Sequence, residues 1–335
     1  MSSSTAGRCA KRDRADEDDI LAVSYLDLQN QDLPIPNVPI QLMRRREYKA
    51  LLLLLPFLTG CLSHTRIVKQ AKMPAVVLTA TAAELVQAVN KQCQAINSLS
   101  ATVEFQATEG GPRKGKEKTY ISLSGYILLR KPEAIRVIGL APVLRSRAFD
   151  MASDGSTFKL LIYYPHDHVI EGSNTVTKES PNPLENMRPK IFFDSLLIDC
   201  IQPDDLVTLT TDMETKVDPK TKQLLLDPQY DLTIARRKPD SQELIPERVI
   251  HFTRTDLRTV QEDIYDQKGA IQTTAIYGPM QQFGPQKFPG TITIKRPLEE
   301  YQIVVTIQKL NVNLTLTDDQ FEIKIPEGAP VTKLE

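Results

Sequence analysis

The amino-acid sequence predicts a mainly β protein of the α+β class, built on one long, curved antiparallel sheet. After residue 206, short segments alternate between bulky apolar and polar residues, and turns with Asp, Gly, Pro or Asn separate many of them. Two helical segments interrupt this pattern, at residues 81–97 and 183–198. No repeat of about 20–50 residues is present, which argues against a propeller or a solenoid.

The first helical segment begins with a capping box, in which Thr81 and Glu84 satisfy free N–H groups of the first turn. Apolar residues then recur at helical spacing on one face, at Leu85, Val89, Cys93 and Ile96. Alternation replaces this spacing in the segments that follow, at 101–107, 120–130, 134–140, 147–152 and 157–164. Asp154-Gly155 predicts a turn between the last two. These segments therefore predict strands that follow one helix.

The second helical segment contains the apolar residues Ile191, Phe192, Leu196 and Leu197, and Pro183 suits its first turn. Strands follow it, which the alternation places at 206–211, 223–227, 230–236, 247–254, 259–266, 270–277, 290–296, 301–310 and 321–325. One face of such a sheet is apolar and must be covered, and we expect the two helical segments to cover it.

An apolar run near the N-terminus has the pattern of a targeting signal. Residues 44–63 read RRREYKALLLLLPFLTGCLS, and the uncharged apolar stretch extends only from Ala50 to Leu58. A membrane-spanning helix needs about 20 residues, and Pro56 would interrupt a core helix. A basic flank, a short apolar run and small residues indicate a secretory signal peptide, with an uncleaved anchor or a buried helix as the alternatives.

The four residues Leu58-Thr59-Gly60-Cys61 resemble a bacterial lipobox. The resemblance implies that the Cys61 thiol receives a diacylglycerol and that cleavage leaves Cys61 as the new N-terminus. Leu62 follows the cysteine, whereas the inner-membrane retention signal of some bacteria is an Asp at that position. We therefore expect a lipid-anchored protein at the bacterial outer membrane, facing the periplasm.

The signal lies unusually far into the chain, because 42 residues precede Met43. We expect translation to begin at Met43, so that residues 1–42 are a non-translated or disordered leader. Residues 43–60 are then the signal peptide, residues 61–78 a tether, and residues 79–330 a single β domain.

Composition excludes several classes of function. The net charge is -1, with 41 Lys and Arg against 42 Asp and Glu, so no basic excess indicates a nucleic-acid partner. Of the four cysteines, Cys93 and Cys200 remain once Cys9 in the leader and Cys61 are set aside. These two could pair in an oxidising envelope compartment, or they could be buried thiols.

The order of elements resembles the lipoprotein-localisation (LolA/LolB-like) superfamily. The resemblance lies in the early helix, in SLSATVEFQA, LSGYILLRKPEAIRVIGLAP and DGSTFKLLIYYP, and in the ending LNVNLTLTDDQFEIKIPEGAPV, so it covers roughly Leu78 to Pro330. It implies an unclosed β-barrel with a helical lid over an apolar cavity that holds acyl chains. A lipidated Cys61 matches the outer-membrane receptor type, but extra sequence in the 180–230 region puts transfer of the same cargo in doubt.

One turn is unexpectedly apolar. The segment IGLAPVLRSR, residues 138–147, lies between two predicted strands and carries Leu140, Pro142, Val143 and Leu144. Turns normally carry polar residues, so this one is either folded onto the core or exposed for contact with a membrane or cargo. Arg145 and Arg147 follow, where they could meet lipid phosphates.

Catalytic patterns are scarce. His166 and His168 are two residues apart and could share a metal if they lie in a strand, but Pro165 and the polar surroundings favour a hairpin tip. His251 is a lone strand histidine with an expected structural role. G-x-S-x-G, H-E-x-x-H and C-x-x-C motifs are absent.

The sequence therefore predicts a non-enzymatic envelope lipoprotein, without a cofactor, that binds acyl chains or lipoproteins and acts in lipoprotein sorting or reception. A lipid-sensing or scaffold lipoprotein is the alternative. A metal-dependent hydrolase based on His166 and His168 is a further alternative.

Overall fold

The computed structural model describes residues 66–163, 167–174, 188–218 and 221–334. The chain divides into two compact units, Met1–Ile67 and Val68–Glu335, and every helix and strand below belongs to the second. The leader, the signal peptide and Cys61 lie outside the described residues, so their assignment stays a prediction. Within the described part of the chain, no helix is both long enough and apolar enough to span a bilayer.

The strands are β1 (Ser98–Gly111), β2 (Lys116–Thr119), β3 (Leu123–Arg130), β4 (Ala134–Leu140), β5 (Arg147–Ser153), β6 (Thr157–Ile162), β7 (His168–Ser173), β8 (Leu206–Val217), β9 (Leu224–Arg237), β10 (Leu244–Thr253), β11 (Thr259–Tyr265), β12 (Ile271–Tyr277), β13 (Met280–Phe283), β14 (Gln286–Pro289), β15 (Thr291–Arg296), β16 (Tyr301–Val312) and β17 (Val331–Leu334). The helices are α2 (Ala82–Ala95), α3 (Pro189–Leu196) and the short 3-10 helix η3 (Asp318–Phe321).

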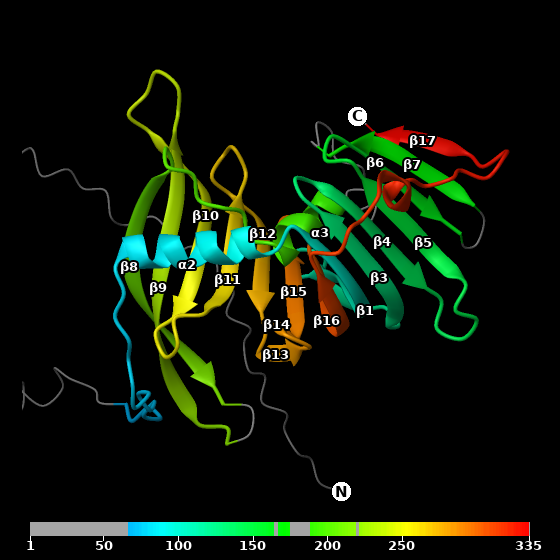
Figure 1. Ribbon diagram of the computed structural model, residues 1–335. Helices are drawn as coiled ribbons and strands as arrows, with labels where there is room; N and C mark the ends of the chain where they lie inside the picture. The colour runs from blue at the N-terminus through cyan, green and yellow to red at the C-terminus, as the bar shows by residue number, and fades with distance from the viewer. Residues whose placement is uncertain (1–65, 164–166, 175–187, 219–220, 335) are drawn as a thin grey trace, which may run out of the picture. The chain divides into compact units, whose positions relative to one another are not determined.

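Fifteen strands form one curved sheet that does not close (Figure 1). Its order is β17-β7-β6-β5-β4-β3-β1-β16-β15-β12-β11-β10-β9-β8, and β2 pairs with β1 beside this path. The expected mainly β fold and unclosed barrel are confirmed. The sheet is not wholly antiparallel, because β17 pairs with β7 in parallel, Val331 opposite Val169. The chain between these two strands is long enough to return β17 in the same direction.

Helix α2 forms as its capping box predicts. The Glu84 N–H donates to the Thr81 hydroxyl at 3.3 Å, and the Thr81 N–H donates to the Glu84 carboxylate at 2.8 Å. The same carboxylate has a lowered pKa, chiefly because it accepts the Thr81 backbone hydrogen bond. Leu85 and Val89 on one face of α2 join the main core.

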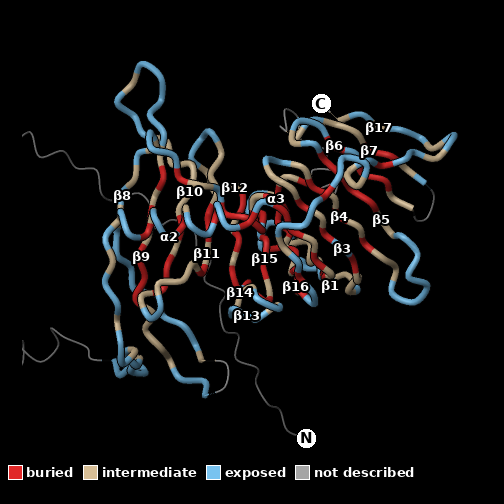
Figure 2. The backbone as a smooth tube through the Cα atoms, in the orientation of Figure 1, coloured by how far each residue is buried: buried red, intermediate tan, exposed pale blue. Residues whose placement is uncertain are grey.

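Helix α3 occupies Pro189–Leu196 of the predicted helical segment, of which residues 183–187 lie outside the described residues. It begins with Pro189 at its first position, where the missing N–H costs nothing. Most of its side chains are buried, while Lys190 and Asp194, one turn apart, are partly exposed. It contacts β4 and β5 on one part of the sheet and β12 and β15 on another, and the Phe192 ring meets the Phe105 ring edge-on at 6.2 Å. The curved sheet thus wraps around α3. Figure 2 shows buried positions along the strands and mostly exposed ones in the loops.

Two strand predictions were wrong. Residues 321–325 form no strand: η3 ends at Phe321, and Ile323 packs with Ala152, Leu161 and Val169 in a small second core. The strands predicted at 223–227 and 230–236 are one continuous strand, β9. Pro228 does not interrupt it, because pairing with β10 ends at Gln229 and the missing N–H falls outside that ladder.

Candidate functional site

The loop between β4 and β5 exposes its apolar residues. Val143 is 90% exposed and Leu144 is 83% exposed, while Leu140, the last residue of β4, is half-buried. Two backbone hydrogen bonds shape the turn, from the Ala141 N–H to the Ser146 carbonyl and from the Arg145 N–H to the Ala141 carbonyl. Val143 and Leu144 therefore lie in an ordered turn in solvent and do not fold onto the core.

The two arginines of this loop differ in their surroundings. Arg145 has a positive φ of 50° and is exposed, and no described residue forms an ion pair with it. The Arg147 guanidinium donates to the Asp150 carboxylate at 3.1 Å. Asp150 is fully buried, and its carboxylate also accepts a hydrogen bond from the Arg136 guanidinium at 2.7 Å. Arg147 is thus fixed beside the loop, whereas Arg145 is available to an external anion.

The apolar face of the sheet is continuous across the molecule. Its buried side chains include Leu99, Val103 and Ile127 in one part, and Leu232, Ile250 and Phe252 in another, all in one core cluster with α2 and α3. The helices therefore cover this face as expected. Whether acyl chains enter between α3 and the sheet stays a prediction.

A second feature, a charged cleft of about 1140 Å³, lies beside α3. The Arg248 guanidinium at its wall donates to the backbone carbonyls of Asp199 at 2.8 Å and Cys200 at 3.2 Å. It also lies 3.4 Å from the Glu262 carboxylate, which is only 2% exposed. Arg248 thus joins the segment after α3 to the sheet.

Glu262 is a buried carboxyl group of this cleft. Burial raises its pKa to about 7, and the Arg248 charge limits the rise. The Tyr277 hydroxyl donates to the same carboxylate at 3.2 Å. Burial likewise raises the pKa of Asp194 on α3 to about 6, and Lys190 at 2.9 Å limits that rise. Such shifts occur at functional sites, but ion-pair networks produce them too, and this cleft has both signs of charge.

The cleft also contains a disulfide bond between Cys93 and Cys200, with Cα atoms 5.4 Å apart. The structure therefore decides between the pairing and the buried thiols that the sequence left open. The Lys131 ammonium lies 3.3 Å from the Cys93 sulfur.

Sequence reasoning did not identify the cleft. In TVQEDIYD, Glu262 shares the inward face with the buried Val260, and a carboxylate on an apolar face is the signal that could have indicated it. Its partner Arg248 lies on the neighbouring strand, and their meeting depends on the β10–β11 register, in which Arg248 is opposite Ile264.

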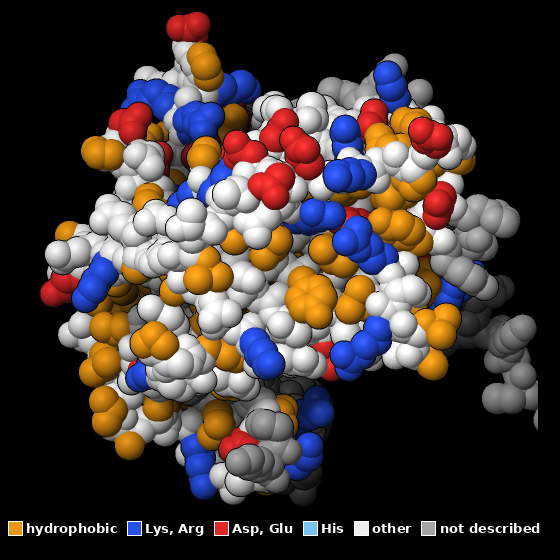
Figure 3. Space-filling view, turned by 45° about the vertical axis from the view of Figure 1, so that its right-hand side comes forward, with side chains coloured by type: hydrophobic (Ala, Val, Ile, Leu, Met, Phe, Trp, Pro, Cys, Tyr) orange, Lys and Arg blue, Asp and Glu red, His pale blue; other side chains and the backbone are white. Residues whose placement is uncertain are grey.

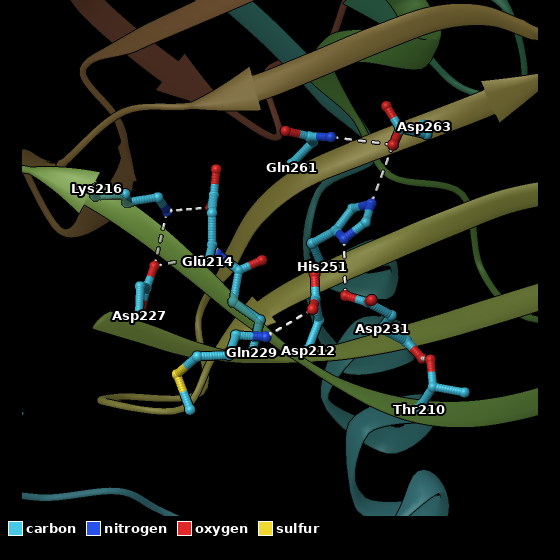
Figure 4. A network of polar contacts seen from close by, with 11 residues as sticks. Thr210, Asp212, Glu214, Lys216, Asp227, Gln229, Asp231, His251, Gln261 and Asp263 are labelled. Carbon is cyan, nitrogen blue, oxygen red and sulfur yellow. Dashed lines mark hydrogen bonds and ion pairs between the residues drawn. The ribbon is translucent and has the colours of Figure 1, made fainter. Parts of the chain in front are cut away.

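His251 has a structural setting on the opposite, polar face of the sheet (Figure 4). Its Nδ1 lies 2.8 Å from an Asp231 oxygen and its Nε2 lies 3.0 Å from an Asp263 oxygen. Burial lowers the pKa of His251, but the two carboxylates outweigh this effect and raise the pKa to about 9. His251 is therefore a charged link between β9 and β11.

The two histidines considered for a metal lie at the β6–β7 connection. His166 is outside the described residues. His168 begins β7, and its Nε2 lies 3.2 Å from the Thr332 hydroxyl of β17. Among the described residues, no group of three or more His, Cys, Asp or Glu side chains is arranged to hold a metal ion.

One face of the molecule carries hydrophobic side chains interspersed with Lys and Arg, while acidic side chains gather toward the upper part of the view (Figure 3). Lipid, protein and peptide ligands are all compatible with such a mixed face, so the face alone assigns no ligand.

No protein-family model and no curated protein matches the chain. Among solved structures, it is similar to a DUF1329 family protein from Desulfovibrio piger (15% identity, 72% of this chain and 95% of that chain, TM-score 0.45). It is also similar to a LolA superfamily protein from Nitrosomonas europaea (12% identity, 73% and 99%, TM-score 0.42). A third is an outer membrane lipoprotein-sorting protein domain from Vibrio parahaemolyticus (12% identity, 71% and 94%, TM-score 0.40). The superfamily named by the sequence resemblance thus appears among similar structures, but at this level of similarity no function is carried over to this chain.

Proposed function

We propose that this protein is a lipid-anchored protein of the bacterial envelope that binds acyl chains or lipoproteins, and that it acts in lipoprotein sorting or reception at the outer membrane. The observation that carries the proposal is the continuous apolar face of an unclosed, curved sheet. A closed barrel filled by its own side chains would leave no entry for an acyl chain. In an open sheet that is covered by a short helix, the helix can move away from the sheet at the open side and admit one.

The energetics of acyl binding suit such a face. Each buried methylene of an acyl chain contributes about 0.8 kcal/mol, and the contribution needs no directional contact. The side chains around α3, such as Phe105, Phe149 and Phe192, offer apolar surface of this kind. They now pack on one another, so an entering chain must displace part of α3 from the sheet.

The anchor is the lipobox cysteine, Cys61. One acyl chain gives only marginal membrane binding, while the two or three chains of a bacterial lipoprotein give a stable anchor. The absence of Asp after Cys61 supports the outer membrane as the destination. In this proposal the β4–β5 loop, with Leu140, Val143, Leu144, Arg145 and Arg147, contacts the membrane or the cargo.

Mass spectrometry of lipids extracted from the purified protein tests the binding function. We expect phospholipid or acylated peptide to co-purify with the folded protein. A stoichiometric metal without any lipid would instead favour the hydrolase based on His166 and His168. The absence of both would contradict acyl binding and favour a scaffold protein.

A further inference from the structure

We infer that the β1–β2 hairpin and the β4–β5 loop together form a docking surface for a bilayer that contains anionic phospholipids. The inference deepens the membrane contact proposed for the β4–β5 loop, and it rests on that proposal. It adds a second element, the hairpin, and it names the class of lipid.

The strand register places the two elements at the same end of the sheet. β1 pairs with β3 as far as Phe105 opposite Leu123, and beyond that point it pairs with β2, Thr108 opposite Thr119. On the other side of β3, Ser124 pairs with Leu140, where β4 ends and the loop begins. Both β2 and the loop therefore project past the start of β3. Neighbouring strands are about 5 Å apart, so the two projections lie near each other.

The hairpin is basic although the whole chain is not. Residues 109–118 contain four basic side chains, Arg113, Lys114, Lys116 and Lys118, against Glu109 and Glu117. The chain as a whole has a net charge of -1, whereas this hairpin has a local excess of two positive charges. Glu300, 3.5 Å from the Arg113 guanidinium, offsets one of them. Arg145 of the neighbouring loop, which forms no ion pair with a described residue, adds to the excess, whereas Arg147 is paired with Asp150.

The tip of the hairpin is held in place by a carboxylate at the end of the neighbouring chain segment before β16. The nearly buried Glu300 carboxylate accepts hydrogen bonds from the backbone N–H groups of Arg113 at 2.7 Å and Lys114 at 3.1 Å. The Lys114 ammonium is partly neutralised by Glu109 at 3.0 Å.

Lys116 is exposed and forms no ion pair with any described residue, so its charge is directed to solvent. Lys118 lies over the Tyr120 ring at 4.5 Å.

Exposed apolar side chains accompany these charges. Ile121, between β2 and β3, is 72% exposed, and Val143 and Leu144 at the loop tip are more exposed still. Large apolar side chains grouped beside cations match the interface of a bilayer, where apolar groups enter the acyl boundary and cations meet lipid phosphates. A nucleic acid would bind the cationic side chains but would gain little from the three exposed aliphatic side chains.

Vesicle co-sedimentation with the full chain carrying Cys61→Ser, which has no lipid anchor, tests the inference. Phosphatidylcholine vesicles are compared with vesicles that also contain phosphatidylglycerol. We expect stronger binding to the anionic vesicles, reduced by added salt. Lys116→Glu with Lys118→Glu should lower the anionic binding on the order of tenfold or more, because each cation near an anionic surface contributes about 1 kcal/mol. Binding to phosphatidylcholine and the melting temperature should stay the same.

The matched control is Lys222→Glu with Lys287→Glu, which makes the same change in net charge in the β8–β9 and β13–β14 hairpins, where both lysines are exposed. It should retain the anionic preference, as should Lys116→Arg with Lys118→Arg. Equal binding to both vesicle types by the parent chain, or an equal loss in the control, overturns the inference. Lipid that co-purifies in the absence of any anionic preference would leave the acyl-binding proposal standing, so the two failures are distinguishable.

Discussion

Cys93 on α2 is joined by a disulfide bond to Cys200 in the segment after α3, across 107 residues of sequence. The bond connects α2 to the segment that follows α3. A cross-link over so long a segment stabilises mainly by restricting the unfolded chain.

Removal of this bond should therefore destabilise the domain. The double variant Cys93→Ser with Cys200→Ser should lower the free energy of unfolding by about 2–5 kcal/mol in urea titrations. The parent protein should lose the same stability on addition of a reductant, whereas the variant should not respond. Equal urea midpoints for the oxidised parent and the variant would show that the bond contributes nothing.

His251 should make stability depend on pH in the mildly alkaline range. Its folded pKa of about 9 lies above the ordinary histidine value of about 6.5, so its contribution is complete below pH 6.5 and is lost as the pH rises toward 9. Thermal melts should show this loss, on the order of 2 kcal/mol, for the parent. His251→Gln should remove most of that slope, and His168→Gln on β7 should retain it. A variant that keeps the full slope would assign it to other groups.

The β4–β5 loop should matter for binding and not for stability. Val143→Glu with Leu144→Glu should abolish most liposome or lipoprotein binding by the chain with Cys61→Ser, because charges replace the apolar tip. Both side chains are exposed, so the free energy of unfolding should change by less than about 0.5 kcal/mol per substitution. Leu244→Glu, at another exposed apolar position, is the control and should bind normally. A fall of many degrees in melting temperature would mark the loop as core.

The packing between α3 and the sheet should be sensitive to Phe192. Phe192→Ala removes a buried ring that meets Phe105, and it should lower the free energy of unfolding by about 3–5 kcal/mol. Urea titration measures the loss, and Ile121→Ala, at an exposed position, should cost little. A small effect at Phe192 would mean that the surroundings collapse into the space or that α3 detaches easily.

The anchor and the start site are tested together in cells. Cys61→Ser should release a soluble or unprocessed form, and a variant that fractionates with membranes at full mature size would refute lipidation. Deletion of residues 1–42 should leave expression, processing and localisation unchanged if Met43 is the initiator. Detection of a tryptic peptide from the leader would contradict that start site.

Short-range patterns in the sequence determined much of this fold. The Thr81 and Glu84 capping box set the start of α2, and alternation predicted most strands, because these signals depend on residues within one helical turn or one pleat. The apolar turn at Val143 and Leu144 was also visible in the sequence. The strand prediction at 321–325 failed, because Ile323 is buried against a second small core that no local pattern reveals. The division of β9 at Pro228 into two strands also failed.

The tertiary structure decided what distant residues do together. Cys93 and Cys200 pair, Arg248 meets Glu262, and the basic hairpin and the β4–β5 loop project from the same end of the sheet only through its register. The exposure of Val143 and Leu144, which the sequence left as one of two alternatives, likewise depends on which elements pack nearby. Local propensity acts over a few residues, whereas these contacts are selected by burial and strand pairing across the whole domain.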